Sequence, residues 1–123
     1  MSVIDEAKAK IKGRGLKLVM PEGEDERIRA AAQRFRSEGL ADPIVFGVSD
    51  LPDAGDAEIA AIRARRDKMT DAMAARLLKK PLYRAGAAVA TGGAHAMLAG
   101  AANPTARVIE AALMTIGPAE GID

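Results

Sequence analysis

The chain has 123 residues and a formal net charge of +1, with 18 lysine and arginine residues against 17 acidic ones. This balance gives no reason to expect a nucleic-acid or membrane partner, and the absence of cysteine excludes a disulfide framework, a zinc ribbon and a thiol nucleophile. The length fits one domain, and neither a secretory leader nor a membrane-spanning run is visible, so we expect a single cytoplasmic domain over residues 1–123. Hydrophobic residues make up 49% and aromatic residues 2%, which predicts alanine-rich helices on a small sheet.

Hydrophobic periodicity predicts helices that alternate with short strands. In chain order, the predicted elements are a helix over 4–12, a strand over 16–20, a helix over 25–38, a strand over 44–46, a loop over 47–55, a helical stretch over 57–80, a helix over 82–91 and a strand over 95–99. Gly39 is placed to end the second helix, and Thr70 to cap a new helix after a break near residues 68–70. Pro81 suits the first position of the helix that follows. The alternation favours an α/β fold with a mainly parallel sheet, in which residues 95–99 form a buried strand.

The segment with the clearest chemical content follows the third predicted strand and opens a helix. Asn103 suits the N-cap, and Pro104 the first helical position. Free N–H groups at a helix start attract anions, and Thr105 and Arg107 add a hydroxyl group and a cation. The carboxyl end of a strand in an open α/β sheet is also where ligands bind. These residues are compatible with a phosphate or pyrophosphate site, but taken alone they favour an ordinary capped helix.

Other conspicuous residues are expected to have structural roles. His95 could act as a general base near neutral pH, but no carboxylate lies near it in sequence, so we expect a structural or partly buried histidine on a strand. Carboxylates around a helix start are favoured by the helix dipole, so we predict no metal site from Glu22, Glu24, Asp25 and Glu26. Four methionines are expected to pack in the core, namely Met69, Met73, Met97 and Met114.

Three stretches resemble segments of a known protein family, both in their residues and in their order along the chain. Residues 18–27 read LVMPEGEDER, residues 38–47 read EGLADPIVFG, and the third stretch runs from 81 to 117. Together they resemble the amino-terminal part of phosphate acetyltransferases, which exchange an acetyl group between coenzyme A and inorganic phosphate. The resemblance covers roughly residues 16–47 and 77–117. It implies an incomplete first domain with an isocitrate/isopropylmalate dehydrogenase-like fold.

The resemblance also implies substrate-binding residues in the segment after the third strand. Thr105 matches a hydroxyl position of the family loop, whereas Asn103 and Pro104 replace the family's His-Ser pair. The family's substrate arginine in this helix falls on Glu110, where a carboxylate would repel phosphate. Arg107, one helical turn earlier, is the nearest basic candidate. We therefore expect Asn103, Thr105 and Arg107 to bind phosphate or coenzyme A.

The resemblance implies a second substrate-binding arginine. In the family it follows a segment that is usually longer than the corresponding segment of this chain. Arg63 is the closest match, with Arg65 and Arg66 as competing alignments. The basic run that these residues form with Lys68 could bind the phosphates of coenzyme A, or it could be a solvated helix face, which we expect.

The resemblance implies a direct attack of the coenzyme A thiol on the acetyl phosphate carbonyl. The serine, arginine and aspartate assigned to catalysis belong to a later part of the family's sequence, so we expect no catalytic residue here and an inactive fragment of a homodimeric enzyme. Its substrates would be small molecules, and it would need no cofactor besides coenzyme A as substrate. The alternative is a noncatalytic acyl-coenzyme A-binding or dimerisation domain, like the one appended to some malic enzymes. The missing catalytic segment and Glu110 favour the alternative for this chain, whereas the order of the matched stretches favours the enzyme for its gene.

Overall fold

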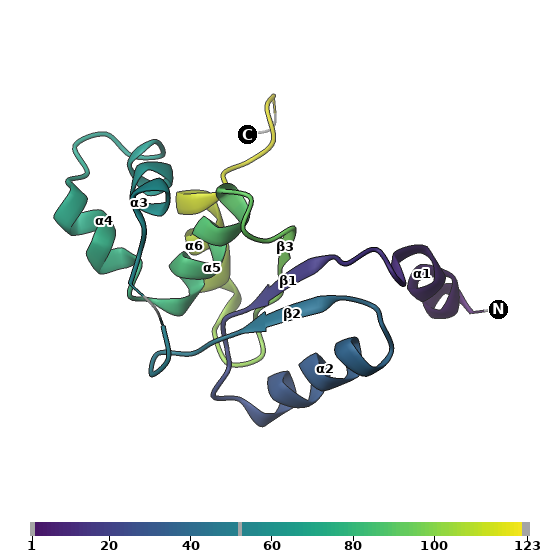
Figure 1. Ribbon diagram of the computed structural model, residues 1–123. Helices are drawn as coiled ribbons and strands as arrows, with labels where there is room; N and C mark the ends of the chain where they lie inside the picture. Colours follow the sequence, from purple (N-terminus) through teal and green to yellow (C-terminus); the bar gives the residue numbers. More distant parts are fainter. Residues whose placement is uncertain (1, 52, 122–123) are drawn as a thin grey trace.

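The computed structural model describes residues 2–51 and 53–121 as an α/β fold built on a three-stranded parallel sheet (Figure 1). The elements in chain order are α1 (Val3–Ile11), β1 (Lys17–Met20), α2 (Glu26–Ser37), β2 (Asp42–Val45), α3 (Asp56–Arg63), α4 (Asp71–Leu77), α5 (Pro81–Ala90), β3 (Ala96–Met97) and α6 (Thr105–Thr115). The α/β class and the parallel sheet predicted from the sequence are confirmed.

The sheet has the order β2–β1–β3, so β1 is its central strand. All of β1 pairs in parallel with β2, and Leu18 and Val19 pair with Ala96 and Met97 of β3. The carboxyl ends of the three strands therefore lie at one edge of the sheet. The loops that follow the strands meet at this edge.

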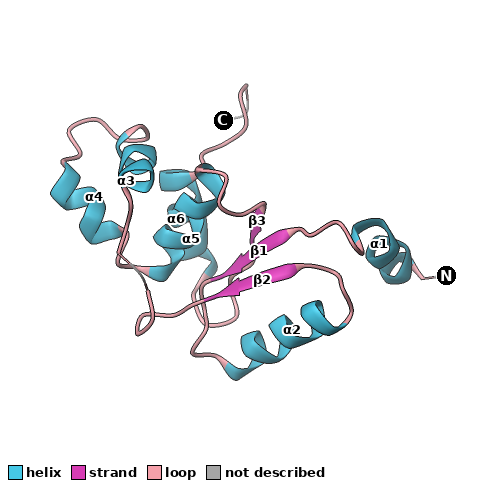
Figure 2. Cartoon of the chain, viewed as in Figure 1, coloured by secondary structure: helices cyan, strands magenta, loops and turns pink. Residues whose placement is uncertain are grey.

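Helices cover both faces of the central strand (Figure 2). Successive side chains of a strand point to opposite faces, and both Val19 and Met20 are fully buried. Met20 packs against Ile28 and Ala32 of α2. Val19 packs on the other side against Ala85 of α5. One short strand thus anchors two helix layers.

Small residues bring α5 and α6 close together, as the alanine-rich composition suggests. A Cβ atom added to Gly86 of α5 would lie 2.9 Å from the Cβ of Thr115 on α6. The Thr115 side chain is buried, and its hydroxyl group donates to the backbone oxygen of Ala111 at 2.7 Å. Leu82 and Tyr83 of α5 pack beside Ala111. This close packing positions the starts of both helices, which border the site described below.

The helical stretch predicted over 57–80 is two helices, α3 and α4. α3 ends at Arg63, and Lys68 in the segment between the two helices has a φ of 65°, which is incompatible with a continuous helix. Thr70 is the N-cap of α4, and its hydroxyl oxygen accepts the N–H of Met73 at 3.1 Å, as its position in the sequence indicates. Met73 itself is 47% exposed because α4 packs inward through Ala74, so its predicted place in the core is wrong.

Two predicted strands differ from the observed ones. β3 is only Ala96–Met97, and neither residue is buried, because β3 is an edge strand paired only with β1 in the described part of the chain. β2 starts at Asp42 rather than at residue 44 and includes Pro43. Proline is tolerated there because β2 is also an edge strand.

Helix α1 projects from the body, at the amino-terminal end of the ribbon (Figure 1). It has no buried residue, and Lys8 Nζ meets Glu38 Oε1 at 3.0 Å. The N–H of Gly13 donates to the backbone oxygen of Gly39. Gly39 has a φ of 68° and ends α2 as predicted. Across residues 2–51 and 53–121, no helix has both the length and the apolar character that crossing a membrane requires.

Candidate functional site

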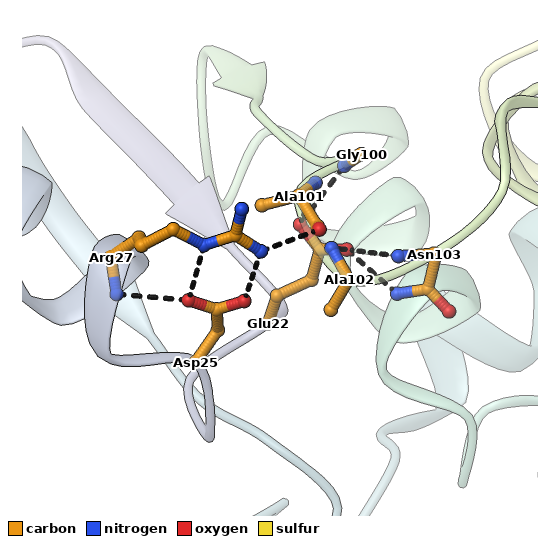
Figure 3. Close-up of polar contacts among 7 residues, drawn as sticks. All are labelled: Glu22, Asp25, Arg27, Gly100, Ala101, Ala102 and Asn103. Carbon is orange, nitrogen blue, oxygen red and sulfur yellow. Dashed lines mark hydrogen bonds and ion pairs between the residues drawn. The ribbon is translucent and has the colours of Figure 1, made fainter.

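The turn between β1 and α2 places Glu22 at the carboxyl edge of the sheet. Gly23 donates its N–H to the backbone oxygen of Phe46, just after β2, at 3.0 Å. A Cβ on Gly23 would lie 2.9 Å from the carbonyl carbon of Phe46, so only glycine fits this approach. Glu22, fixed next to this contact, is 4% exposed and points into the loop after β3 (Figure 3).

The carboxylate of Glu22 accepts hydrogen bonds from four consecutive backbone amides. Oε1 accepts from Gly100 and Ala101 at 2.9 and 3.0 Å. Oε2 accepts from Ala102 and Asn103 at 2.8 Å each, and from the Asn103 side-chain amide at 2.8 Å. Gly100 has a φ of 119°, a conformation that favours glycine. A concave run of N–H groups binds anions, and we call residues 100–103 the amide nest.

The nest determines the charge state of Glu22. Burial acts to raise the pKa of Glu22, but hydrogen bonds from Ala102, Asn103, Ala101 and Gly100 together hold it below its ordinary value. Glu22 is therefore ionised at neutral pH.

The nest also changes the expected start of α6. The sequence predicted Asn103 as N-cap and Pro104 as the first helical residue. Instead, Pro104 is the N-cap and α6 begins at Thr105. Asn103 does not cap the helix because its side chain donates to Glu22. The expectation for the cap is corrected by one residue.

Arg27 contacts the same loop through a backbone carbonyl group of the loop. Asp25, the N-cap of α2, accepts the Arg27 N–H at 2.9 Å and binds the guanidinium through both oxygens at 3.1 and 2.7 Å. Hydrogen bonds from Arg27 lower the pKa of Asp25 to about 2. Arg27 Nη2 also donates to the Ala101 oxygen at 2.8 Å. Glu22 and Arg27 thus bind the N–H and the C=O of one residue, Ala101 (Figure 3).

A cleft of about 580 Å³ opens beside the nest, and we call it the strand-end cleft. Its wall includes Glu22 after β1, Val48 after β2 and Asn103 after β3. In an open α/β sheet, ligands bind at this edge. Four carboxylates and two cations line the cleft, namely Glu22, Glu24, Asp25, Glu110, Lys80 and Arg107. The cleft is the candidate ligand site, although its excess of carboxylates is unfavourable to a free phosphate.

Tyr83 fixes Glu110 on the wall of the strand-end cleft. The Tyr83 hydroxyl donates to Glu110 Oε1 at 2.8 Å. Burial and this hydrogen bond to a carboxylate raise the pKa of Tyr83 to about 12. Lys80 Nζ lies 5.9 Å from the centre of the Tyr83 ring, within cation–π range. These three residues lie side by side on the cleft wall, and Glu110 lies three residues after Arg107 on α6.

Two of the four predicted binding residues line the strand-end cleft. They are Asn103 and Arg107, whereas Thr105 lies exposed at the first position of α6. Arg63 does not line this cleft; it lies at the end of α3, and its guanidinium donates to Asp71 Oδ1 at 2.7 Å. A binding role for each of the four stays a prediction.

The other candidates have structural contacts. His95 precedes β3 and is exposed, which corrects the expected partly buried position on a strand. Its Nδ1 accepts the Lys17 N–H at 2.9 Å and so ties the two strand starts together. Glu24 accepts the Val48 N–H at 2.7 Å. Within the described ranges, no group of three or more histidine, cysteine, aspartate or glutamate residues could hold a metal ion.

The sequence interpretation missed the contacts of Glu22, Arg27 and Tyr83. A signal for Glu22 was available, because it follows one strand of a parallel sheet and the glycine-containing loop follows another. The carboxyl ends of such strands meet. Nothing in the sequence pairs Tyr83 with Glu110, which lie on different helices.

The chain is similar to one protein family in both sequence and structure. A family model described as Phosphate acetyl/butaryl transferase matches residues 56–123. A Paracoccus denitrificans protein named phosphate acetyltransferase is 35% identical over 117 residues, covering 85% of this chain and 36% of the relative. A Staphylococcus epidermidis phosphate acetyltransferase is 29% identical over 136 residues, covering 92% of this chain and 41% of the relative. The chain thus spans about two fifths of the length of these curated relatives.

Solved structures agree with the sequence matches. The crystal structure of a phosphotransacetylase from Streptococcus pyogenes aligns with the whole chain at a TM-score of 0.89 and 28% identity, covering 45% of that protein. The EutD phosphotransacetylase from Staphylococcus aureus aligns with 98% of the chain at a TM-score of 0.83 and 27% identity, covering 43% of that protein. The fold described above is therefore that of part of a phosphotransacetylase.

Proposed function

Because the chain belongs to the phosphate acetyl/butaryl transferase family, we propose that it is part of an acyltransferase that exchanges an acetyl group between coenzyme A and inorganic phosphate. The observation that carries this proposal is the strand-end cleft, in a fold that aligns over the whole chain with a phosphotransacetylase. Proteins of this family act on small molecules. We propose a cytoplasmic location and no cofactor besides coenzyme A as substrate.

The strand-end cleft supplies binding groups for this reaction. Arg107 and Lys80 are its two cations and are the residues that we assign to the anionic groups of the substrates. Thr105 adds a hydroxyl group at the start of α6. Asn103 lies on the wall of the cleft with one side-chain N–H donated to Glu22, and its substrate-binding role remains part of this proposal. In the proposed reaction the coenzyme A thiol gives up its proton to a base, the sulfur forms a bond with the acetyl carbon, and the bond between that carbon and the phosphate oxygen breaks, so phosphate leaves with its electron pair.

No residue of this chain is assigned to removing the thiol proton or to stabilising the oxyanion. We therefore expect the purified chain to bind coenzyme A without catalysing exchange, because transition-state stabilisation needs groups aimed at the developing charge. The test is an assay of acetyl phosphate formation from acetyl-coenzyme A and phosphate, with calorimetric titration of coenzyme A on the same sample. Turnover well above background would refute the assignment of the catalytic groups to another part of the enzyme. Absence of binding at millimolar coenzyme A would refute the assignment of the cleft.

A second candidate is a noncatalytic acyl-coenzyme A-binding or dimerisation domain of the same fold. The observation that favours it is Glu110, a carboxylate fixed by Tyr83 beside Arg107, which weakens the cleft for inorganic phosphate. For this candidate we expect acyl-coenzyme A to bind and inorganic phosphate to have no effect on it. Competition between phosphate and acyl-coenzyme A in the titration would favour the enzyme.

A further inference from the structure

We propose that Glu22 is the resident anion of the amide nest, occupying the site that its N–H groups would otherwise offer to a free anion and thereby positioning Asn103 and the start of α6 at the strand-end cleft. Glu22 is a positioning residue in this proposal, not a catalytic one. The proposal concerns contacts within this chain and holds whether or not the cleft carries acetyl exchange.

The geometry of Glu22 is that of a bound ligand rather than of an incidental contact. Both oxygens are used: Oε1 accepts from two donors and Oε2 from three, and every distance lies between 2.8 and 3.0 Å. Four of the donors are consecutive main-chain N–H groups, which is the arrangement by which loops bind phosphate and other anions. The carboxylate is nearly inaccessible to water, so it and the nest satisfy one another.

The loop is held against Glu22 from its other side as well. Arg27 donates to the Ala101 oxygen at 2.8 Å and is itself fixed by Asp25. An anion on the N–H side and a cation on the C=O side leave residues 100–103 little freedom to turn. A substrate anion therefore cannot use these four amides while Glu22 is in place, and must bind beyond them, on the side of Arg107.

The proposal predicts that protonation of Glu22 loosens the nest, because a neutral carboxyl group accepts N–H bonds more weakly. The charged groups around Glu22 and the adjoining cleft are Glu24, Asp25, Arg27, Lys80, Arg107 and Glu110. Arg27 favours the ionised form of Glu22, whereas the carboxylates disfavour it. A direct observation of the nest amides separates Glu22 from these neighbours, because the amides of residues 100–103 bind only Glu22.

The first test follows the amide signals of residues 100–103 by NMR as the pH of the unmodified chain is lowered from 7 to 2.5. We expect the four signals to move together, with one apparent pKa below 4.5, the ordinary value for glutamate. Signals that do not move before the chain unfolds, or that follow separate titrations, would overturn the proposal.

The second test replaces the resident anion with a free one. Glu22→Ala removes the carboxylate, and formate is a carboxylate small enough to occupy the vacated space. We expect Glu22→Ala to lower Tm by about 10 °C, and 100 mM sodium formate to restore about 5 °C if formate binds with a dissociation constant on the order of 10 mM. Acetate should restore less of the lost Tm than formate does, and propionate should restore none. Sodium chloride at the same concentration measures the effect of salt alone.

The matched control is Glu26→Ala, four positions along the chain, where the carboxylate is exposed and touches no nest amide. We expect a Tm change within about 2 °C and no response to formate beyond that to chloride. Equal formate responses in the two variants would overturn the proposal.

If Glu22→Ala does not fold, Glu22→Gln keeps the side-chain shape without the charge. We expect this variant to fold with a lower Tm at pH 7 and with a smaller loss of stability between pH 5 and pH 3 than the parent shows. A Glu22→Gln variant with the parent's Tm and the parent's acid sensitivity would also overturn the proposal.

Discussion

The contact between α5 and α6 makes Gly86→Ala the most informative stability variant. The added methyl group would overlap the Thr115 side chain, which is buried and bonded to Ala111, and so has little room to move. Overpacking of this kind costs about 2–3 kcal/mol. Alanine gains about 1 kcal/mol over glycine inside a helix, which offsets part of the cost. We expect a net loss of about 1–2 kcal/mol in the free energy of unfolding.

The assay is urea unfolding of Gly86→Ala in two backgrounds, the parent and Thr115→Ala. The second background removes the Thr115 hydroxyl and methyl groups, so Gly86→Ala should cost about 1 kcal/mol less there. Gly92→Ala is the control, because Gly92 has a φ of 83° and no neighbouring atom within 4 Å. Its cost arises from the backbone and should be the same in both backgrounds. A Gly86→Ala variant as stable as the parent, or equally costly in both backgrounds, would refute this packing argument.

Four further predictions follow from the site and from the surface of α6. Glu110→Gln keeps an acceptor for Tyr83 but removes a negative charge from the strand-end cleft, so calorimetry should show phosphate or coenzyme A binding about five-fold more tightly. Arg107→Ala should weaken the same binding about ten-fold; unchanged affinities in both variants would contradict the assignment of the cleft. Tyr83, with a pKa raised to about 12 in the folded state against an ordinary 10, stabilises the fold fully below pH 10 and loses this contribution between pH 10 and pH 12. Urea unfolding at a series of alkaline pH values should show that the free energy of unfolding falls by about 2 kcal/mol in the parent but not in Tyr83→Phe. The same pH dependence in both proteins would contradict this contribution of Tyr83. Ile109 and Leu113 are each 54% exposed one turn apart on α6, so we expect self-association, which Leu113→Glu should abolish in sedimentation; a monomeric parent at high concentration would argue against an interface on this face.

Local chemistry made much of the fold predictable. Gly39 ends α2 with a positive φ, Thr70 caps α4, and Pro81 opens α5, each for a reason contained within a few residues. The central strand was predictable from its apolar run between glycines and an acidic helix start. Such signals need no knowledge of distant contacts.

Tertiary contacts decided the features that the sequence did not reveal. Met73 has helical spacing suited to a core, but the orientation of α4 is set by packing at Ala74, and Met73 faces outward. The residues after β3, Leu98 and Ala99, are as apolar as a buried strand, yet only Ala96 and Met97 are register partners of β1, and the N–H of Leu98 makes the last hydrogen bond to that strand. Apolar character alone does not determine where pairing stops.

The sequence identified the region in which the strand-end cleft lies but not the contacts that shape it, and the binding role of its residues stays a prediction. The carboxyl end of the third strand and the loop after it were identified from the sequence, with Asn103 and Arg107. Glu22 was not identified as the partner of this loop. It lies 78 residues before Gly100 and binds main-chain groups, so the signal was indirect: Glu22 and the loop follow two parallel strands whose carboxyl ends meet. The sequence of this loop is typical of an open anion site, but its N–H groups already bind the chain's own carboxylate.

The most direct test of the assignment of the strand-end cleft is chemical-shift mapping of the isotopically labelled chain titrated with coenzyme A and, separately, with inorganic phosphate. We expect coenzyme A to shift the signals of Lys80, Tyr83 and Arg107 in a saturable way, and to leave α1 unaffected. Phosphate should shift Arg107 while the amides of residues 100–103, already bound to Glu22, move little. Saturable shifts confined to surfaces away from the cleft, or none at millimolar ligand, would contradict the proposed binding site.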